Sequence, residues 1–164
     1  RYLTYLALSL HKGKDRIFTN SKAEALWNQI LGQHYSTVIF SDVLSELVDA
    51  NNVVFHEGDN QYSLGHLSYQ EYLAALGVVY TQNFKLLVEK VSEAWWREVI
   101  VFYVGIIGDS SGFLDKLLEQ HGIPEDKTFV AALQAEGTYT TNLTRDFMRD
   151  ALEEECDWDD NFDL

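Results

Sequence analysis

SDVLSELVDANNVVFHEGDNQYSLG, residues 41–65, changes from a helical to a strand pattern along its length. An apolar stripe at helical spacing predicts a helix that starts at Ser41 and stops at Asn51-Asn52. β-Forming residues follow at 53–55, and turn-forming residues occupy 57–60 before an alternating return strand. The stretch therefore predicts a helix followed by a β-hairpin.

Two further helices are expected upstream of this stretch. Apolar residues recur at helical spacing from Tyr2 to Leu10, and Gly13 breaks the pattern. Ser21-Lys-Ala-Glu24 has the form of a capping box and predicts a second helix that runs to Ile30. Three helices followed by a hairpin are the order of a winged helix, so we expect a winged-helix domain over residues 1–80.

The rest of the chain has a helical pattern. A second capping-box pattern, Ser68 to Glu71, opens a helix through about Tyr80. Apolar stripes predict further helices, with Pro124 in a first helical position of one of them. We expect a helical bundle or a short α-solenoid-like lobe over residues 81–152, so that the fold class is mostly α. The last of these helices is expected over 143–155.

The chain is strongly acidic, and half of the excess lies at one end. Its 164 residues carry 12 Lys+Arg and 26 Asp+Glu, a net charge of −14, and residues 153–164 contain seven acidic and no basic side chains. We expect this tail to be a solvated, disordered end, with a docking peptide around Trp158 as the alternative. Cys156 is the single cysteine, which excludes an intrachain disulfide and favours a reducing cytoplasm. The longest apolar run, Val99 to Ile107, is too short to cross a membrane.

DNA binding is the obvious alternative for a winged helix, because the third helix of such a domain commonly enters the major groove. Here that helix contains Asp42, Glu46 and Asp49 and has no Lys or Arg. Carboxylates are repelled by the phosphate backbone. We therefore expect the domain to pack against protein, and a DNA-binding regulator with a helical dimerisation domain is the less favoured hypothesis.

Motifs of enzyme sites are missing from the sequence. It contains no G-x-x-x-x-G-K-[ST] loop for phosphates, no G-x-G-x-x-G and no G-x-S-x-G. Its five histidines show no H-x-x-x-H spacing, and one cysteine cannot build a Cys-rich zinc site. We expect no catalytic residue, no metal and no cofactor held by this segment alone.

Residues 62–75, YSLGHLSYQEYLAA, resemble the end of the winged-helix domain in NACHT-family NTPases of the STAND class. That family carries an aromatic-rich strand followed by H-x-[ST]-[FY]-Q-E-[FY]-[LF]-A-A, and residues 66–75 match each specified position. Leu64 departs from the family, which often has Phe there. Downstream, residues 96–99 (WREV) resemble a segment of the family's helical region, and the resemblance covers roughly residues 1–120.

The resemblance implies a parent ATPase whose upstream NACHT domain, the intrachain partner of this segment, holds ADP or ATP with Mg²⁺. In the resting state the winged helix would close over ADP, and the histidine that matches His66 would contact the β-phosphate. Exchange for ATP would open the domains and permit homo-oligomerisation in a signalling or defence switch. Since no Met precedes Arg1, we expect a segment of a longer chain.

Physical chemistry supports the role of His66, because backbone N–H groups and the helix dipole favour anions at a helix N-terminus. The alternative is a histidine that forms local hydrogen bonds at a strand–helix junction. Ser68 and Glu71 are expected to form a structural cap. A third hypothesis for the whole segment is a protein-interaction scaffold whose acidic tail binds a basic partner.

Four other side chains of the matching segments are expected to pack between the two lobes. Arg97 is also expected to pair with Glu98, on the surface or between helices. The four expected packing residues are Tyr72, Trp95, Trp96 and Arg97.

Overall fold

The computed structural model describes residues 1–32, 35, 37–50, 53–122 and 124–138. Over these residues it contains eight α-helices and one three-stranded antiparallel sheet, so the mostly helical prediction is confirmed. The chain divides into two compact units, one of residues 1–81 and one from residue 82 onward. The domain boundary expected at residue 80 lies beside this division.

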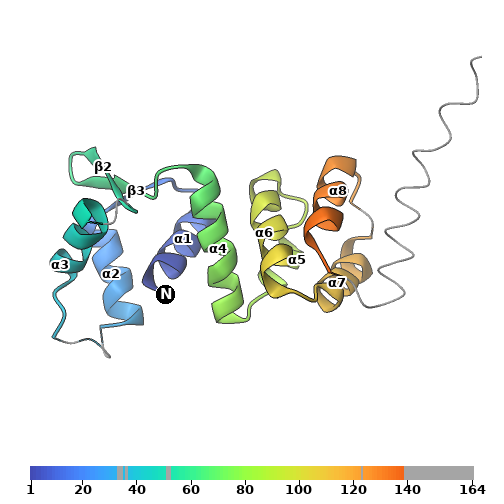
Figure 1. Cartoon of the computed structure of the whole chain (residues 1–164), viewed down its shortest axis with the longest axis horizontal. Coiled ribbons are helices and arrows are strands. Elements are labelled where there is room, and N and C mark those ends of the chain that lie inside the picture. The colour runs from blue at the N-terminus through green and yellow to red at the C-terminus, as the bar shows by residue number, and fades with distance from the viewer. Residues whose placement is uncertain (33–34, 36, 51–52, 123, 139–164) are drawn as a thin grey trace, which may run out of the picture. The chain divides into compact units, whose positions relative to one another are not determined.

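The first unit alternates short helices and strands (Figure 1). Helices α1 and α2 flank the short strand β1, and α3 continues into one π-helical turn before the hairpin of β2 and β3. Helix α4 completes the unit. The bounds are α1 Tyr2–Gly13, β1 Ile17–Thr19, α2 Asn20–Ile30, α3 Phe40–Ser45, the π-helical turn Glu46–Ala50, β2 Phe55–Gly58, β3 Gln61–Ser63 and α4 Leu67–Thr81.

The sheet has the order β1-β3-β2, with β3 antiparallel to both neighbours. A hairpin is confirmed, but its first strand is Phe55–Gly58 and not the predicted 53–55, and Asp59 and Asn60 form its turn with positive φ angles of 46° and 60°. Asx side chains tolerate this left-handed backbone, as the sequence indicated. Strand β1 was not predicted, because its three residues are too few to show an alternating pattern.

Helix α1 packs along α4, and together they form the core of the first unit. Leu6 and Leu10 of α1 are fully buried, as is Val78 of α4. An aromatic cluster closes one end of this core: the Tyr2 ring lies edge-on to Trp27 at 5.3 Å and to Phe40 at 5.9 Å between ring centroids.

The capping box predicted at Ser21 is wrong. Helix α2 begins at Asn20, and Thr19 is its N-cap, whose Oγ1 accepts a hydrogen bond from the backbone N–H of Lys22 at 3.3 Å. Strand β1 runs directly into α2, so the last extended residue takes the capping position. Ser21 consequently lies inside the first turn.

The described part of the second unit is built of helices joined by short loops, with one isolated parallel bridge between Asp109 and Thr138. Helix α6 packs against α8, and α5 packs against α7, around buried side chains such as Ile100 and Leu114. Pro124 does not start α8, because Asp126 is the N-cap of that helix. The bounds are α5 Lys85–Glu89, a 3-10 turn at Ala94–Trp96, α6 Arg97–Ile107, α7 Ser111–His121 and α8 Lys127–Glu136.

Several predictions concern residues outside the described part of the chain. They are the helix stop at Asn51-Asn52, the helix expected over 143–155 and the acidic tail 153–164. Within the described part, none of the helices combines the length and the apolar character needed to cross a membrane.

Candidate functional site

His66 lies in the short connection between β3 and α4, where the chain turns from sheet to helix. Gly65 makes this turn with a φ of 74°, and α4 begins directly after His66. The His66 carbonyl accepts hydrogen bonds from the backbone N–H groups of Tyr69 at 3.0 Å and Gln70 at 3.4 Å. His66 therefore occupies the N-cap position of α4, and its side chain is exposed.

The hydrogen bonds of the His66 ring assign its tautomer. The ring Nδ1 accepts a hydrogen bond from the backbone N–H of Ser68 at 3.3 Å and lies 3.0 Å from Ser68 Oγ. Because a backbone N–H can only donate, Nδ1 carries no proton and Nε2 carries it. Nε2–H makes no hydrogen bond to the described residues, so it is a donor available to an external acceptor.

The predicted cap formed by Ser68 and Glu71 is corrected by these contacts. Helix α4 starts one residue before Ser68, so Ser68 lies in the first turn and the ring of His66 takes the capping role. Glu71 lies one turn further on and is buried. The pattern S-x-x-E marked the right helix, but the tight turn at Gly65 places the cap two residues earlier.

Gln70 holds the start of α4 against the rest of the first unit. Its side chain is only 2% exposed, and its Nε2 donates a hydrogen bond to the backbone carbonyl of Asp15 at 2.9 Å. This contact joins α4 to the loop that follows α1. The sequence identified Gln70 only as a match to the motif, because its partner lies 55 positions away and no local pattern indicates the contact.

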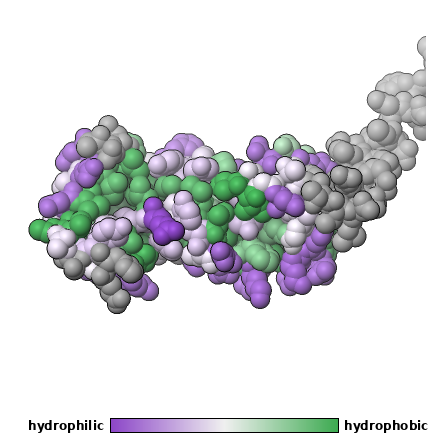
Figure 2. All heavy atoms as spheres, turned by 60° about the horizontal axis from the view of Figure 1, so that its bottom comes forward, coloured by the Kyte–Doolittle hydropathy of each residue, from purple (hydrophilic) through white to green (hydrophobic). Residues whose placement is uncertain are grey.

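Exposed apolar side chains lie close to His66. The ring of Phe55 is 46% exposed and lies against Gly65, and Tyr69 is 40% exposed on the first turn of α4. Ile17 is 48% exposed, and it lies beside Ser63 on one side of β3 as Phe55 does on the other. The sequence analysis missed this apolar rim, although Phe55 in a short edge strand is a signal for it. Figure 2 shows green hydrophobic surface between purple polar side chains on one face of the described residues.

The four side chains expected to pack between lobes have different surroundings. Tyr72 is 40% exposed on α4, and Trp96 is buried in the second unit, where Trp95 is half-buried. Arg97 forms an ion pair with Asp126, and its guanidinium lies 5.7 Å from the centroid of the Phe129 ring. Arg97 thus joins α6 to the start of α8, and the pair predicted with Glu98 is wrong. Packing between the lobes stays a prediction for Tyr72, Trp95, Trp96 and Arg97.

Asp126 is the N-cap of α8 as well as the partner of Arg97. Its Oδ1 accepts hydrogen bonds from the backbone N–H groups of Thr128 at 3.0 Å and Phe129 at 3.2 Å. Hydrogen bonds from the Thr128 side chain and from Phe129, together with the nearby Arg97 charge, lower the pKa of this carboxyl group. These contacts of Asp126 are structural, because they cap α8 and join its start to α6.

Comparisons with known proteins give little further information. No protein-family profile matches the chain, and no solved structure matches it. Lipase maturation factor 2 from Xenopus laevis is 28% identical over 133 residues, which cover 75% of this chain. The chain spans only 18% of the length of that protein, so the similarity is partial and distant. Among the described residues, no cluster of three His, Cys, Asp or Glu side chains could hold a metal ion.

Proposed function

We propose that this chain is the winged-helix and following helical portion of a NACHT-type NTPase of the STAND class. In this proposal the first unit is a winged helix: three helices precede a hairpin wing, and β1 adds a third strand to it. The described helices of the second unit form the adjoining helical lobe. The match of residues 66–75 to the family motif supports the same assignment.

One observation carries the functional part of the proposal. The ring of His66 presents an exposed Nε2–H at the start of a 15-residue helix. The unpaired N–H groups and the dipole of such a helix favour a negatively charged partner. His66 therefore donates to the terminal phosphate of an ADP that the upstream domain of the parent protein supplies.

The chain's own residues make one part of this nucleotide site. His66 and the first turn of α4 contact the phosphate end, while the apolar rim of Phe55, Ile17 and Tyr69 provides area for contact with the upstream domain. The base, the ribose and Mg²⁺ belong to that upstream domain. This division fits a single side-chain donor and a chain without a P-loop.

A switch follows from this arrangement. The closed state is favoured only by contacts that ADP makes with both domains, since a ligand shifts an equilibrium by its differential affinity for two states. ATP places its additional phosphate where His66 contacts ADP, which removes the favourable contact and opens the domains. Opening exposes the surfaces that form the oligomer.

The test uses the parent protein with the substitution His66→Ala. Loss of a hydrogen bond to a charged group costs about 1.5–3 kcal/mol, so ADP affinity is expected to fall by roughly 10- to 100-fold. Basal oligomerisation, measured by light scattering, is expected to rise. His121→Ala is the control, because His121 is also exposed but lies at the end of α7. Unchanged ADP affinity in His66→Ala contradicts the proposal.

The DNA-binding alternative is disfavoured by the exposed surface of α3 and its π-helical turn. Asp42, Glu46 and Asp49 are all exposed there, where a recognition helix needs basic side chains. A gel-shift assay at low salt, where electrostatic binding is strongest, is expected to show no complex with duplex DNA.

A further inference from the structure

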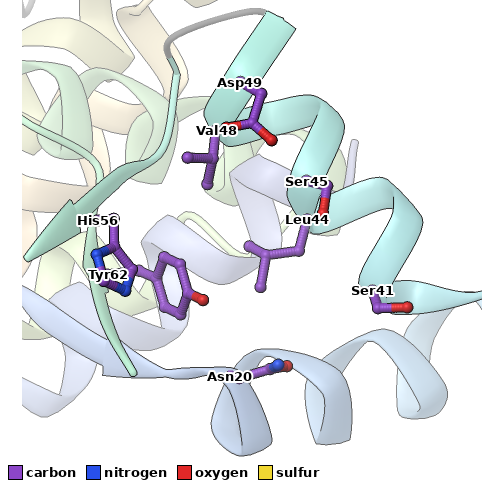
Figure 3. A pocket seen from close by; sticks show the side chains of 8 residues that line it. All are labelled: Asn20, Ser41, Leu44, Ser45, Val48, Asp49, His56 and Tyr62. Carbon is purple, nitrogen blue, oxygen red and sulfur yellow. The ribbon is translucent and has the colours of Figure 1, made fainter. Parts of the chain in front are cut away.

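A cleft of about 350 Å³ lies between α3 and the sheet of the first unit. Leu44 and Asp49 line it from α3 and the π-helical turn, and His56 and Tyr62 line it from β2 and β3 (Figure 3). Asn20, the first residue of α2, lines the cleft from that helix. None of these residues belongs to the His66 region, so the cleft is a separate feature of the first unit.

One lining residue of the cleft has an unpaired buried acceptor, and another has a carboxylate without an ion-pair partner among the described residues. Oδ1 of Asn20 is buried and accepts no hydrogen bond from the described residues. The carboxylate of Asp49 is exposed and forms no ion pair with a described Lys or Arg. Oδ1 of Asn20 is closed off from solvent, so it can meet a ligand only if the side chain turns, whereas the carboxylate of Asp49 is open to a positively charged donor.

The charge of the cleft selects a cation. Its lining contains one carboxylate and no Lys or Arg, and Asp42 and Glu46 add negative charge on the same helical segment. This field repels phosphates and carboxylates and attracts positively charged groups. A neutral ligand gains nothing from the field.

Tyr62 provides a fixed aromatic surface in the cleft. Its ring stacks on Phe18, with 5.9 Å between centroids, and meets His56 edge-on at 5.1 Å. Guanidinium groups combine five N–H donors with a planar face that stacks on aromatic rings. An ammonium group has no planar face to lie against the Tyr62 ring while it donates to Asp49.

We infer that this cleft binds the arginine side chain of an extended segment of a protein partner. Its volume is at the low end for small-molecule sites, which suits one long side chain better than a nucleotide. The chain's net charge of −14 favours encounter with a basic segment. The inference is independent of the proposed function, because it uses no residue of the nucleotide site.

The test titrates the 164-residue chain with a capped Gly-Arg-Gly peptide and follows backbone amide shifts by NMR. Saturable shifts are expected at the residues that line the cleft. A peptide with citrulline, the uncharged isostere, in place of arginine is expected to give no saturable shift. Free L-arginine is expected to bind more weakly than the peptide, because its own carboxylate adds negative charge beside Asp49.

Matched variants locate the binding charge. Asp49→Asn is expected to weaken peptide binding by roughly three- to fivefold, the upper part of the range for an exposed ion pair. Asp42→Asn removes the same charge from the same helical segment outside the lining, and is expected to change affinity by less than about twofold. Equal losses in both variants, equal binding of the citrulline peptide, or tighter binding of free arginine than of the peptide overturns the inference.

Discussion

Gly65 controls the residue on which the functional proposal depends. Its φ of 74° allows β3 to turn directly into α4, so that His66 reaches the N-cap position. A Cβ at Gly65 would lie 2.8 Å from Cε2 of Phe55. The backbone angle therefore requires glycine at this position, and a Cβ would in addition push the exposed Phe55 ring aside.

Gly65→Ala is expected to lower the free energy of unfolding of the first unit by at least about 1–2 kcal/mol, the cost of a left-handed backbone for a residue with a Cβ. Urea unfolding followed by circular dichroism measures the change. The double variant Phe55→Ala/Gly65→Ala relieves the clash but keeps the backbone cost. Gly58→Ala in the same unit is the comparison for the backbone cost alone, because its φ is 97° and its Cβ meets nothing within 4 Å. An unchanged Gly65→Ala midpoint contradicts this account of the turn.

Among the secondary-structure elements, α1 and α4 make the closest helix contact described in the first unit. A Cβ at Gly77 of α4 would lie 2.6 Å from the backbone oxygen of Thr4 and 3.0 Å from Cβ of Leu8 in α1. Backbone atoms cannot retreat as a side-chain end can. The absence of a side chain at Gly77 therefore sets how closely the two helices pack.

Gly77→Ala is expected to destabilise the first unit despite the better helix propensity of alanine. The propensity gain of about 1 kcal/mol is smaller than the upper range for overpacking, about 1–3 kcal/mol. A net loss of about 1 kcal/mol lowers the melting temperature by roughly 4–8 °C in a unit of this size. Thermal unfolding measures it, and a melting temperature above the wild-type value shows that α1 and α4 pack less closely.

The cap of α8 predicts a pH dependence for the second unit. The folded-state pKa of Asp126 lies below its ordinary value, so its stabilisation is present above the unfolded-state pKa of about 3.9. It is lost as the pH falls from there through the folded-state pKa. We expect Asp126→Asn to reduce the loss of melting temperature in this acidic range.

The control for Asp126 is Glu125→Gln, which changes an exposed neighbour without the cap or the ion pair. Melting temperatures from pH 3 to 7 at constant ionic strength are expected to follow the wild type in this variant. If Asp126→Asn keeps the full acid dependence of the wild type, Asp126 is not the group responsible.

In the whole molecule, the chain forms two compact units that divide after Thr81. The first unit has its own core, in which α1, α4 and the aromatic cluster around Tyr2 are buried. A unit of 81 residues is large enough to fold alone. A protein of residues 1–81 is therefore expected to unfold cooperatively on heating, and a gradual transition contradicts the division.

The sequence predicts patterns that repeat over many residues better than it predicts contacts between distant ones. The helices and the hairpin were recognisable because apolar periodicity is local. Helix starts were misplaced at Ser21 and Ser68, since the cap depends on where the preceding strand ends. The Arg97–Asp126 pair joins residues 29 positions apart, and no sequence pattern indicates it.

The candidate site could be predicted only in part, because a sequence shows local motifs and does not show contacts between distant residues. His66 was recognisable from a contiguous motif, and the structure adds the tautomer and the exposed Nε2–H. The cleft could not be found in the sequence, because Asn20, Asp49 and Tyr62 come from three separate elements. Only the folded arrangement of α2, α3 and the sheet brings them together.

Hydrogen–deuterium exchange in the parent protein tests the central claim most directly. The first amides of α4 have no carbonyl acceptor in a preceding helical turn, and the Ser68 N–H is held only by the exposed ring of His66, so these amides exchange quickly unless a neighbour covers them. The account predicts that ADP slows exchange over residues 64–69, that a non-hydrolysable ATP analogue restores it, and that His66→Ala weakens the protection. Equal exchange over these residues in the ADP-bound and nucleotide-free protein contradicts the account.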